Sequence, residues 1–357
     1  MIGEYMVQMK RSKLVWGVIL TSAAYFILSY SFTGRLGLGE TVVSAAPEVT
    51  LEKVREAAYK EGQLIWYESS PEGQIAKVIS AFNKRYPKIK LEHVRLRGAD
   101  IGTRIIAESQ ANAPTADVGT TGLEILLPLD ERGLLIRSNW TELGIPQKLI
   151  ATPYALISMA SIYCLNYNTN LVSEADAPKK WEDVLNPKWK GKIGIWQKPS
   201  AIALLAPAWG EERTLDFAKK LAEQKLVFYQ SSFPLNDAVA AGEISVGITI
   251  YHTTTAALEK GAPLKLVFAD PTPYEPLCSA IPVKSSHPNT AKLFTAWLLS
   301  LEGAEAYERA THRGNPWITG TEAYKLLHGK KLSSFTAEQS KDFADISKKL
   351  ERILVSR

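Results

Sequence analysis

The sequence predicts an α/β protein made of two units, each a mixed β-sheet flanked by helices. Its 357 residues are enough for two domains at the usual size of about 100–200 residues per domain. Hydrophobic residues make up 46% of the chain and charged residues 22%, which are values typical of folded proteins. From Leu51 onward, helical and strand patterns alternate along the chain, and this order is typical of a sheet covered by helices.

The first part of this alternation lies between residues 50 and 122. Apolar residues about 3.6 positions apart, with Gly62 and Pro87 as stop signals, are typical of helices. The expected helices are 50–62, 71–86 and 99–112, and the expected strands are 63–70, 89–98 and 116–122. Ligands of parallel sheets bind beyond the carboxyl ends of the strands. The loops at 68–70, 97–98 and 120–121 are therefore expected to face a ligand.

The second part begins with a long β-rich run at 157–172 and then alternates again. The tryptophan-rich stretch at 181–196 is expected to start as a short helix. That helix should end at Asn186, because Pro187 lacks an N–H group and disfavours a helical residue before it. Further strands are expected at 193–196, 226–231, 244–251, 264–270 and 277–286, and further helices at 210–224, 234–243, 253–261, 287–311 and 336–357.

Residues 1–45 are predicted to be a signal peptide or an N-terminal membrane anchor. Lys10, Arg11 and Lys13 precede an uncharged apolar run at 14–32, which is the order found in export signals. Small residues at Val43 and Ala45 make cleavage after Ala45 the expected outcome for a signal, whereas the length of the apolar run also suits an anchor. Either interpretation places the folded chain in the periplasm or on the outer face of the cytoplasmic membrane.

Charge and motif content exclude several function classes. The net charge is +5 and no basic block is interleaved with aromatics, so no nucleic-acid partner is expected. The sequence has no G-x-S-x-G elbow, no P-loop lysine and no G-x-G-x-x-G loop, so no enzyme is expected. The enzyme alternative is a hydrolase with Ser69 or Tyr251 as nucleophile. The histidines are dispersed, and no cofactor is expected.

Six motifs in a fixed order carry a resemblance to a known family. The motifs are EGQLIWYESSPEG, RIIAESQANAPTADV, YNTNLV, WEDVLNPKWKGKIGI, AAGEISVGI and HPNTAKLFTAWLLSLEGAEAY. Through them the chain resembles the bacterial extracellular solute-binding proteins of ABC importers, in the branch that includes ferric-iron binders, over about residues 50–320.

The resemblance implies the type II periplasmic-binding-protein fold, with two lobes around a cleft and hinge strands between them. Lobe 1 is expected to contain 46–161 and 279–318, and lobe 2 to contain 162–278 and 319–357. The 181–196 stretch is then expected to dock on lobe 2 and lead into its first core strand. The hinge strands would contain Cys164 and Cys278, which are predicted to form a disulfide.

The implied function is capture of a small solute, favoured to be an organic anion, by a monomer that delivers it to an ABC permease. The alternatives are a ferric-iron-binding protein and a ligand-sensing ectodomain. The family's ferric binders carry two adjacent tyrosines where this chain has Tyr251 followed by His252, which favours an organic ligand over iron.

The candidate ligand-binding residues lie at strand ends and helix starts, where hydroxyls and free N–H groups can bind an anion. Arg97 could add a bidentate contact to such a ligand. The structural alternatives are helix capping for the serines and a solvated side chain for Arg97. If the ligand were iron, Tyr251, His252 and Glu68 would hold it. The full set of candidates is Ser69, Ser70, Arg97, Thr120, Thr121, Ser200, Tyr251, His252 and Thr253.

Overall fold

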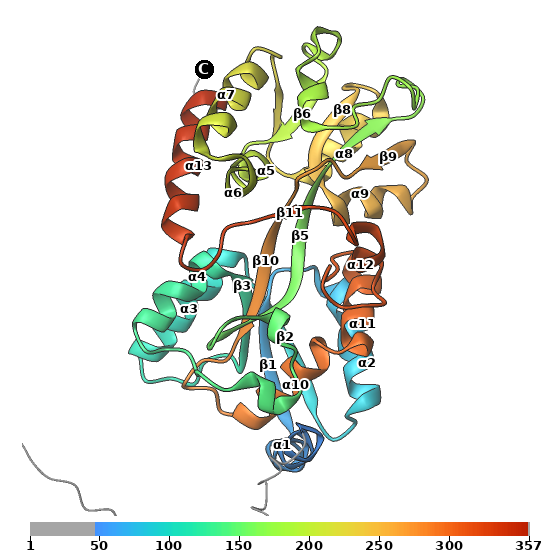
Figure 1. The fold of residues 1–357 in the computed structure, drawn as a ribbon. Coiled ribbons are helices and arrows are strands. Elements are labelled where there is room, and N and C mark those ends of the chain that lie inside the picture. The colour runs from blue at the N-terminus through green and yellow to red at the C-terminus, as the bar shows by residue number, and fades with distance from the viewer. Residues whose placement is uncertain (1–46, 356–357) are drawn as a thin grey trace, which may run out of the picture. The chain divides into compact units, whose positions relative to one another are not determined.

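The computed structural model describes residues 47–355, and the predicted signal or anchor at 1–45 lies outside this range. Two long antiparallel strands, β5 (Ala155–Asn168) and β10 (Thr272–Ala280), run through the middle of the described chain (Figure 1). The strand order along the curled sheet is β2-β1-β3-β10-β5-β8-β6-β7. One lobe forms at each end of this order, and this is the predicted two-lobed α/β fold.

Lobe 1 has a parallel set of strands to which the crossing strands are added antiparallel. The strands are β1 (Gln63–Glu68), β2 (Lys90–Arg95), β3 (Val118–Gly122) and the short β4 (Ile150–Thr152). The helices are α1 (Pro47–Glu61), α2 (Glu72–Arg85), α3 (Gly98–Gln110), α4 (Leu123–Glu131), α10 (Pro288–Leu298) and α11 (Leu301–Thr311). The predicted elements up to residue 122 are thus confirmed, with ends that differ by a few residues.

Aromatic residues fill the core of lobe 1. Trp66 on β1 is fully buried and meets Phe294 of α10 edge-on, with ring centroids 5.0 Å apart. Phe82 of α2 packs against the same Phe294 at 5.1 Å. Side chains of this size contribute a large share of hydrophobic stabilisation, at about 25 cal/mol per Å² of apolar area buried.

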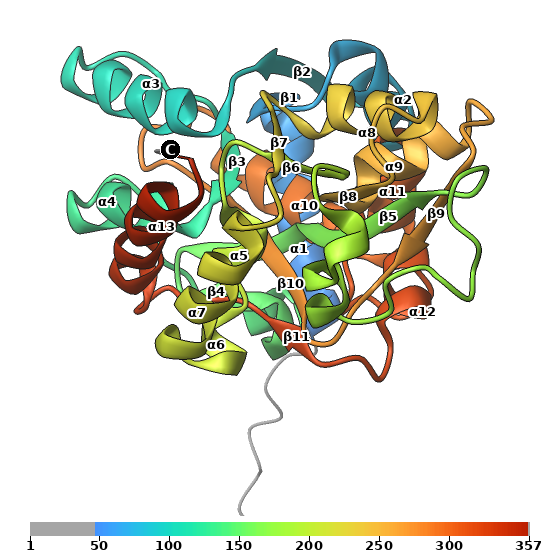
Figure 2. The ribbon, with the colours of Figure 1, turned by 90° about the horizontal axis from the view of Figure 1, so that it is seen from above.

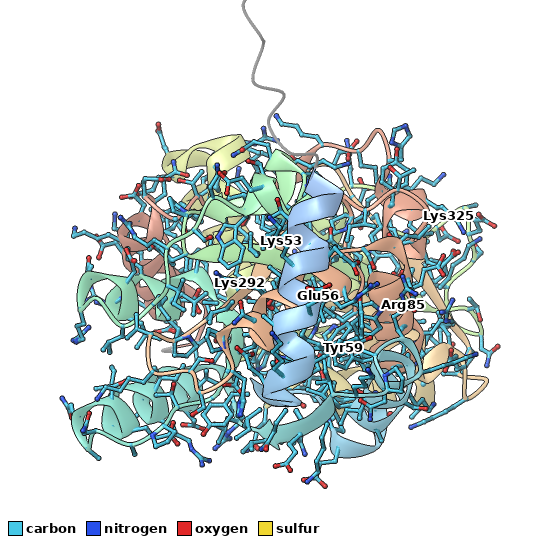
Figure 3. All side chains as sticks on the ribbon, turned by 90° about the horizontal axis from the view of Figure 1, so that it is seen from below. Lys53, Glu56, Tyr59, Arg85, Lys292 and Lys325 are labelled. Atoms are coloured by element: carbon cyan, nitrogen blue, oxygen red, sulfur yellow. The ribbon has the colours of Figure 1, made fainter. Side chains whose placement is uncertain are left out.

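Helices α1 and α10 are joined at the far end of lobe 1. Glu61, the last residue of α1, accepts hydrogen bonds from the backbone N–H groups of Asn289 and Thr290 in the first turn of α10. A carboxylate is favourable there because it satisfies orphan donors at the helix start. Figure 3 shows α1 across this end of the unit, with Lys53, Glu56 and Tyr59 along it.

The predicted single helix at 287–311 is two helices, and this is a correction. Ser300 separates α10 from α11, and its hydroxyl accepts a hydrogen bond of 3.2 Å from the N–H of Gly303. The chain turns so tightly that a Cβ at Gly303 would lie 2.0 Å from the carbonyl oxygen of Trp297. The break folds α11 back against α2.

Lobe 2 is a second sheet with helices on its faces. Its strands are β6 (Ile193–Trp196), β7 (Val227–Tyr229), β8 (Val246–Ile250) and β9 (Leu264–Val267). β8 and β9 pair with the far half of β5, β6 pairs with β8, and β7 pairs with β6. Its helices are α5 (Ser200–Ala203), α6 (Ala206–Trp209), α7 (Glu211–Ala222), α8 (Ser232–Ala241), α9 (Tyr251–Leu258) and α13 (Ser340–Leu354). Seen from above in Figure 2, α3, α4 and α13 lie on one side of the crossing strands and α9, α11 and α12 (Glu322–Leu327) on the other.

The tryptophan-rich stretch forms two short 3-10 turns, Trp181–Leu185 and Pro187–Trp189, in place of the expected helix. The break at Pro187 is confirmed. Trp181 is fully buried in the lobe 2 core, and its indole N–H donates to the carbonyl of Pro271 over 2.8 Å. β6 follows at Ile193, so this stretch anchors the first strand of the lobe 2 sheet.

The chain passes between the lobes within β5. Residues 156–162 of β5 pair with β10, and residues 163–168 pair with β8 and β9. This change of partner falls between Ile162 and Tyr163, one residue after the expected boundary at 161/162. The chain returns from lobe 2 to lobe 1 between β9 and β10, because all of β10 pairs with β3, β5 or the short β11 (Leu332–Ser333). The pairing supports moving the proposed boundary at 278/279 back to the start of β10.

The predicted Cys164–Cys278 disulfide is wrong, because both cysteines are free and buried. Cys278 lies opposite Ile157, so Cys164 is 164 − 157 = 7 residues further along β5. At about 3.3 Å per residue this is about 23 Å, whereas a disulfide needs Cα atoms about 4–7 Å apart. Within residues 47–355, none of the helices combines the length and apolar character that spanning a bilayer requires.

Candidate functional site

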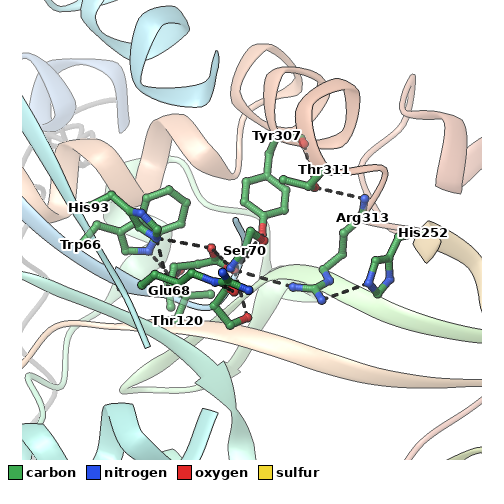
Figure 4. A network of polar contacts seen from close by, with 12 residues as sticks. Trp66, Glu68, Ser70, His93, Thr120, His252, Tyr307, Thr311 and Arg313 are labelled. Atoms are coloured by element: carbon green, nitrogen blue, oxygen red, sulfur yellow. Dashed lines mark hydrogen bonds and ion pairs between the residues drawn. The ribbon is translucent and has the colours of Figure 1, made fainter. Parts of the chain in front are cut away.

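A buried carboxylate at the end of β1 organises the polar groups between the lobes. Glu68 is 1% exposed and accepts hydrogen bonds from the Ser70 N–H (2.6 Å), the Ser70 hydroxyl (3.0 Å) and the Tyr307 hydroxyl (3.0 Å). Figure 4 shows these groups meeting at the strand end. Burying a carboxylate is unfavourable unless its oxygens are paired, and these bonds supply the pairing. We call Glu68, Ser70, His93, Tyr307, Arg313 and His252 the interlobe network.

His93 covers one side of Glu68. Its Nε2 atom lies 3.8 Å from a Glu68 carboxylate oxygen and 3.3 Å from the Glu68 carbonyl oxygen. Burial lowers the pKa of His93, although the negative charge of Glu68 acts in the opposite direction. The ring also packs edge-on against Trp66. His93 comes from β2, so neighbouring parallel strands both contribute to the network.

Arg313 brings a positive charge into the network. Its Nη1 atom lies 3.6 Å from a carboxylate oxygen of Glu68, and its Nη2 atom lies 3.3 Å from Nε2 of His252 at the start of α9. Glu68 belongs to lobe 1 and His252 to lobe 2. The guanidinium therefore bridges the two lobes, as Figure 4 shows.

The loop after α11 fixes the position of Arg313. His312 ends α11 in the left-handed conformation, with a φ of 59°. Asn315 then donates from its side chain to the carbonyls of Ile157 and Ser158 on β5, over 2.9 and 3.2 Å. Because both sides of the loop are held, Arg313 is directed toward Glu68 without support from a ligand.

The network leaves several hydrogen-bond donors without acceptors. Arginine can only donate, so Nε2 of His252 accepts from Arg313 and the His252 proton lies on Nδ1. Burial, with smaller contributions from the charges of Arg313 and His312, lowers the pKa of His252 well below its usual value, so the ring is neutral. Among the described residues, Nδ1 of His252 and Nε and Nη1 of Arg313 have no hydrogen-bond partner.

Buried donors without an acceptor are costly, at about 1–3 kcal/mol each, although Nη1 of Arg313 still lies in an ion pair 3.6 Å from the Glu68 carboxylate. They are satisfied when a group rich in acceptor oxygens, such as a carboxylate or a phosphate, lies against them. The arrangement is therefore suited to binding an anion between the lobes.

A row of hydrogen-bonded side chains, which we call the hydroxyl ladder, lies below the interlobe network. None of its donors lacks an acceptor. The Trp66 indole N–H donates to the Thr120 hydroxyl over 2.8 Å, Thr120 contacts the Ser279 hydroxyl at 2.9 Å, and Ser158 donates to Ser279 over 2.7 Å. All four side chains are buried. Thr120 thus ties β1 to β10 within lobe 1.

The structure brings some of the predicted site residues together and leaves the others apart. Glu68, Ser70 and His252 converge in the interlobe network, with Ser69 beside them, its hydroxyl 3.4 Å from Glu68. Thr121 donates to the carbonyl of Gly98, and Thr253 donates to the carbonyl of Ile250 within lobe 2. The side chain of Arg97 is 93% exposed and pairs with Asp100, so the structure does not bring Arg97 to the network.

Ser200 and Tyr251 lie near the network without joining it. Ser200 hydrogen-bonds to the buried Tyr163, whose hydroxyl donates to Glu275 on β10 over 3.1 Å. Burial raises the pKa of Tyr251 to about 12, and its ring packs against Phe268. Among residues 47–355, no three His, Cys, Asp or Glu side chains converge as metal ligands.

Sequence reasoning missed Arg313, Tyr307 and Glu275. Tyr307 lies in α11 and Arg313 lies just after it, and the sequence shows this helix only as amphipathic. The available signal was the turn RGNP at 313–316, in which an arginine is followed at once by residues that end helices. Glu275 was a charged residue just before the predicted strand at 277–286 and inside the observed strand β10.

Comparison with known proteins adds a family description. A sequence model described as bacterial extracellular solute-binding protein matches residues 139–335, which is more than half of the chain. An uncharacterized protein of Haemophilus influenzae is 26% identical over 269 residues, covering 71% of this chain and 77% of the relative.

Solved structures share the fold. Iron-bound HitA from Pseudomonas aeruginosa superposes with a TM-score of 0.67 at 21% identity, covering 82% of this chain and 99% of HitA. The periplasmic binding protein AfuA from Actinobacillus pleuropneumoniae, solved with fructose-6-phosphate bound, superposes with a TM-score of 0.65 at 26% identity, covering 82% of this chain and 98% of AfuA. Both are similar to the described chain along nearly their whole length.

Proposed function

The chain belongs to the bacterial extracellular solute-binding proteins, and we propose that it captures a small organic anion between its lobes and delivers it to an ABC permease in the membrane. The observation that carries the proposal is the set of three buried donors on Arg313 and His252 without a hydrogen-bond acceptor, of which Nη1 of Arg313 also forms an ion pair with Glu68. A carboxylate or phosphate placed against them would receive charge-assisted hydrogen bonds. In this proposal the protein is an exported monomer with no catalytic role.

The position of the donors supports capture by lobe closure. Arg313 is held by hydrogen bonds to β5 through Asn315, whereas His252 starts a helix of lobe 2. A ligand that bridges the two would favour the closed arrangement of the lobes, because it contacts both only when they meet. Release to the permease would follow when the lobes separate.

The likeness to AfuA supports an organic anion with a phosphate group as one class of ligand. AfuA was solved with fructose-6-phosphate and is 26% identical to this chain. Several phosphate oxygens can accept hydrogen bonds from an arginine fork and a histidine N–H at the same time.

Ferric iron is the second candidate, because iron-bound HitA shares the fold. A ferric ion prefers several anionic oxygen ligands, and Tyr251 would have to ionise against a pKa raised to about 12. Arg313 would also place a positive charge beside the metal. Both features favour an anion over the cation.

Calorimetry of stripped protein tests the proposal. Ferric citrate is titrated alongside phosphorylated and carboxylated metabolites such as glucose 6-phosphate and succinate, with wild type and with Tyr251→Phe. We expect heat from at least one organic anion, unchanged in Tyr251→Phe. Iron binding that depends on Tyr251 and gives a phenolate charge-transfer band, with no response to any organic anion, would contradict the proposal.

A further inference from the structure

Glu68 lies at the centre of the interlobe network, and its charge is part of what a ligand meets there. Its carboxylate accepts hydrogen bonds from the N–H and the hydroxyl of Ser70 and from the hydroxyl of Tyr307. These contacts suit an ionised carboxylate, which accepts hydrogen bonds and cannot donate them. Because Glu68 is buried, its negative charge is held inside the protein whether or not a ligand is bound.

Arg313 is the largely buried cation that faces this carboxylate. Its Nη1 atom lies 3.6 Å from a Glu68 oxygen, which is close enough for an ion pair and too far for a hydrogen bond. Near pH 8 the two histidines add no charge, because burial lowers the pKa of His93 and lowers that of His252 well below its usual value. Arg95 beside the network is exposed, so solvent screens its charge. Within the network, the charges of Glu68 and Arg313 therefore cancel before a ligand binds.

A ligand at the free donors lies close to Glu68 as well as to Arg313. Within the described part of the chain, Nη1 of Arg313 has no hydrogen-bond acceptor, and a ligand oxygen that accepts from it lies about 2.9 Å away. The same Nη1 atom is 3.6 Å from the Glu68 oxygen, so the ligand oxygen is at most about 6.5 Å from that carboxylate. This is shorter than the Debye length of about 8 Å in physiological salt, and salt screens buried charges even less.

The repulsion from Glu68 limits how much negative charge the site accepts. The first negative charge of a ligand exchanges its hydration for the free donors of Arg313 and His252. A second charge on the same group meets no second cation among the six residues of the interlobe network. It would lose its hydration, which costs more as the charge rises, while Glu68 repels it. A doubly charged group is therefore disfavoured.

Building on the proposed function, we propose that Glu68 is a specificity-determining residue, which restricts the ligand to organic anions that place a single negative charge at the interlobe network. Carboxylates, sulfonates and phosphodiesters meet this condition, whereas phosphate monoesters, with two charges on one group, bind more weakly. Glu68 acts on the ligand through its charge, and its hydrogen bonds to Ser70 and Tyr307 hold that charge in place.

Three pairs of probes test this inference by calorimetry on stripped protein at pH 8. The members of a pair have nearly the same shape and differ by one charge: glucose 6-sulfate and glucose 6-phosphate, ethyl sulfate and ethyl phosphate, malonamate and malonate. Phosphate monoesters lose their second proton near pH 6 and are dianions at pH 8, whereas sulfate esters keep a single charge. We expect wild type to bind the singly charged member at least tenfold more tightly in at least one pair, and the doubly charged member more tightly in none.

Variants test whether Glu68 causes this preference. Glu68→Gln removes the charge and keeps the size of the side chain and an oxygen for the Ser70 N–H. Because Glu68 repels two charges more strongly than one, the preference should fall at least fivefold in this variant. Glu61→Gln is the matched control, since it removes a carboxylate at the far end of lobe 1 and should leave the preference unchanged. Ser69→Asp adds a carboxylate beside Glu68 and should widen the preference.

The outcomes separate the two proposals. A wild-type preference below tenfold in every pair, or tighter binding of a doubly charged member, would overturn the charge restriction and leave the anion proposal standing. A preference that falls less than fivefold in folded Glu68→Gln would overturn Glu68 as its cause. If thermal unfolding shows that Glu68→Gln does not fold, Ser69→Asp decides in its place, and an unchanged preference there overturns the assignment. Binding of none of the six probes would overturn both proposals.

Discussion

Two buried polar networks, one between the lobes and one inside lobe 2, look alike in composition and differ in what they leave unpaired. In lobe 2, the amide oxygen of Asn236 accepts from Asn166, Thr249 and Thr254, and its amide nitrogen donates to Thr253. These side chains are almost fully buried. The interlobe network is equally buried around Glu68, but it keeps free donors on Arg313 and His252.

The difference teaches how a binding site can be told from a structural network. In the Asn236 network, every donor named above has an acceptor, and the atom left over is an acceptor, Oδ1 of Asn166. In the interlobe network, the leftover atoms are donors on two neighbouring side chains, one from each lobe. Burial of polar side chains alone does not mark a site, whereas unpaired donors at the contact between two lobes point to one.

The largest effect is expected on stability, from Asn236→Ala. The substitution leaves Thr249 without its acceptor and Asn166 with only its longer 3.4 Å bond to Thr254, and each orphaned buried group costs about 1–3 kcal/mol. We expect a loss of about 3 kcal/mol in the free energy of unfolding, with ligand affinity unchanged. Urea denaturation and calorimetry measure the two quantities. A large loss of affinity at unchanged stability would show that the Asn236 network belongs to the site.

The next largest effect is a loss of ligand affinity, which we expect in Arg313→Ala. Loss of a charge-assisted hydrogen bond should weaken binding of an organic anion by about 1.5–3 kcal/mol, or about 10- to 150-fold. Arg97→Ala is the matched control, because the side chain of Arg97 is 93% exposed and outside the network. We expect Arg97→Ala to bind as wild type does. Calorimetry that ranks the two variants the other way would restore Arg97 as the anion contact.

A smaller effect is expected on the pH dependence of stability, from His252→Gln. The folded-state pKa of His252 lies well below its unfolded value of about 6.5, so only the unfolded state takes up a proton just below pH 6.5. This contribution to stability is present above pH 6.5 and is lost as the pH falls. Between pH 7.5 and 5.5, wild type should lose about 1 kcal/mol more than His252→Gln. Equal losses in urea titrations would mean that His252 is charged in the fold.

The smallest effect is expected from Thr121→Val. Thr121 was predicted to contact the ligand, but its hydroxyl donates to the carbonyl of Gly98 over 3.3 Å within lobe 1. The valine should lower the free energy of unfolding by about 0.5–1 kcal/mol and change anion affinity less than twofold. A tenfold loss of affinity in calorimetry would bring Thr121 back into the site.

Much of the fold could be predicted because local signals and the folded environment agree. Gly62, Pro87 and the alternating run at 89–98 each mark an element that the structure contains. The break at Ser300 was missed because the residues on both sides have good helical periodicity. Only the close approach of Gly303 to Trp297, a contact made by folding back, requires the turn.

The site was less predictable because its key contacts join distant parts of the chain. Strand-end reasoning found Glu68, Ser70 and His252, since the ends of strands follow from local pattern. Arg313 lies 245 residues from Glu68 (313 − 68), and nothing in its neighbours states which carboxylate it meets. The disulfide was wrong for a related reason: adjacent strands were predicted correctly, but the register that separates Cys164 from Cys278 was not.

The interleaved path of the chain has a consequence for biosynthesis. The core of lobe 2 combines Phe217 and Leu221 of α7 with Ile346, Leu350 and Leu354 of α13, although α10 and α11 of lobe 1 lie between them in the sequence. Lobe 2 therefore stays open along α7 until α13 has been synthesised. A nascent chain halted near residue 335 would display Phe217 and Leu221 to chaperones, while the aromatic core of lobe 1 around Trp66 and Phe294, whose buried residues extend only to Ile318, could already be closed.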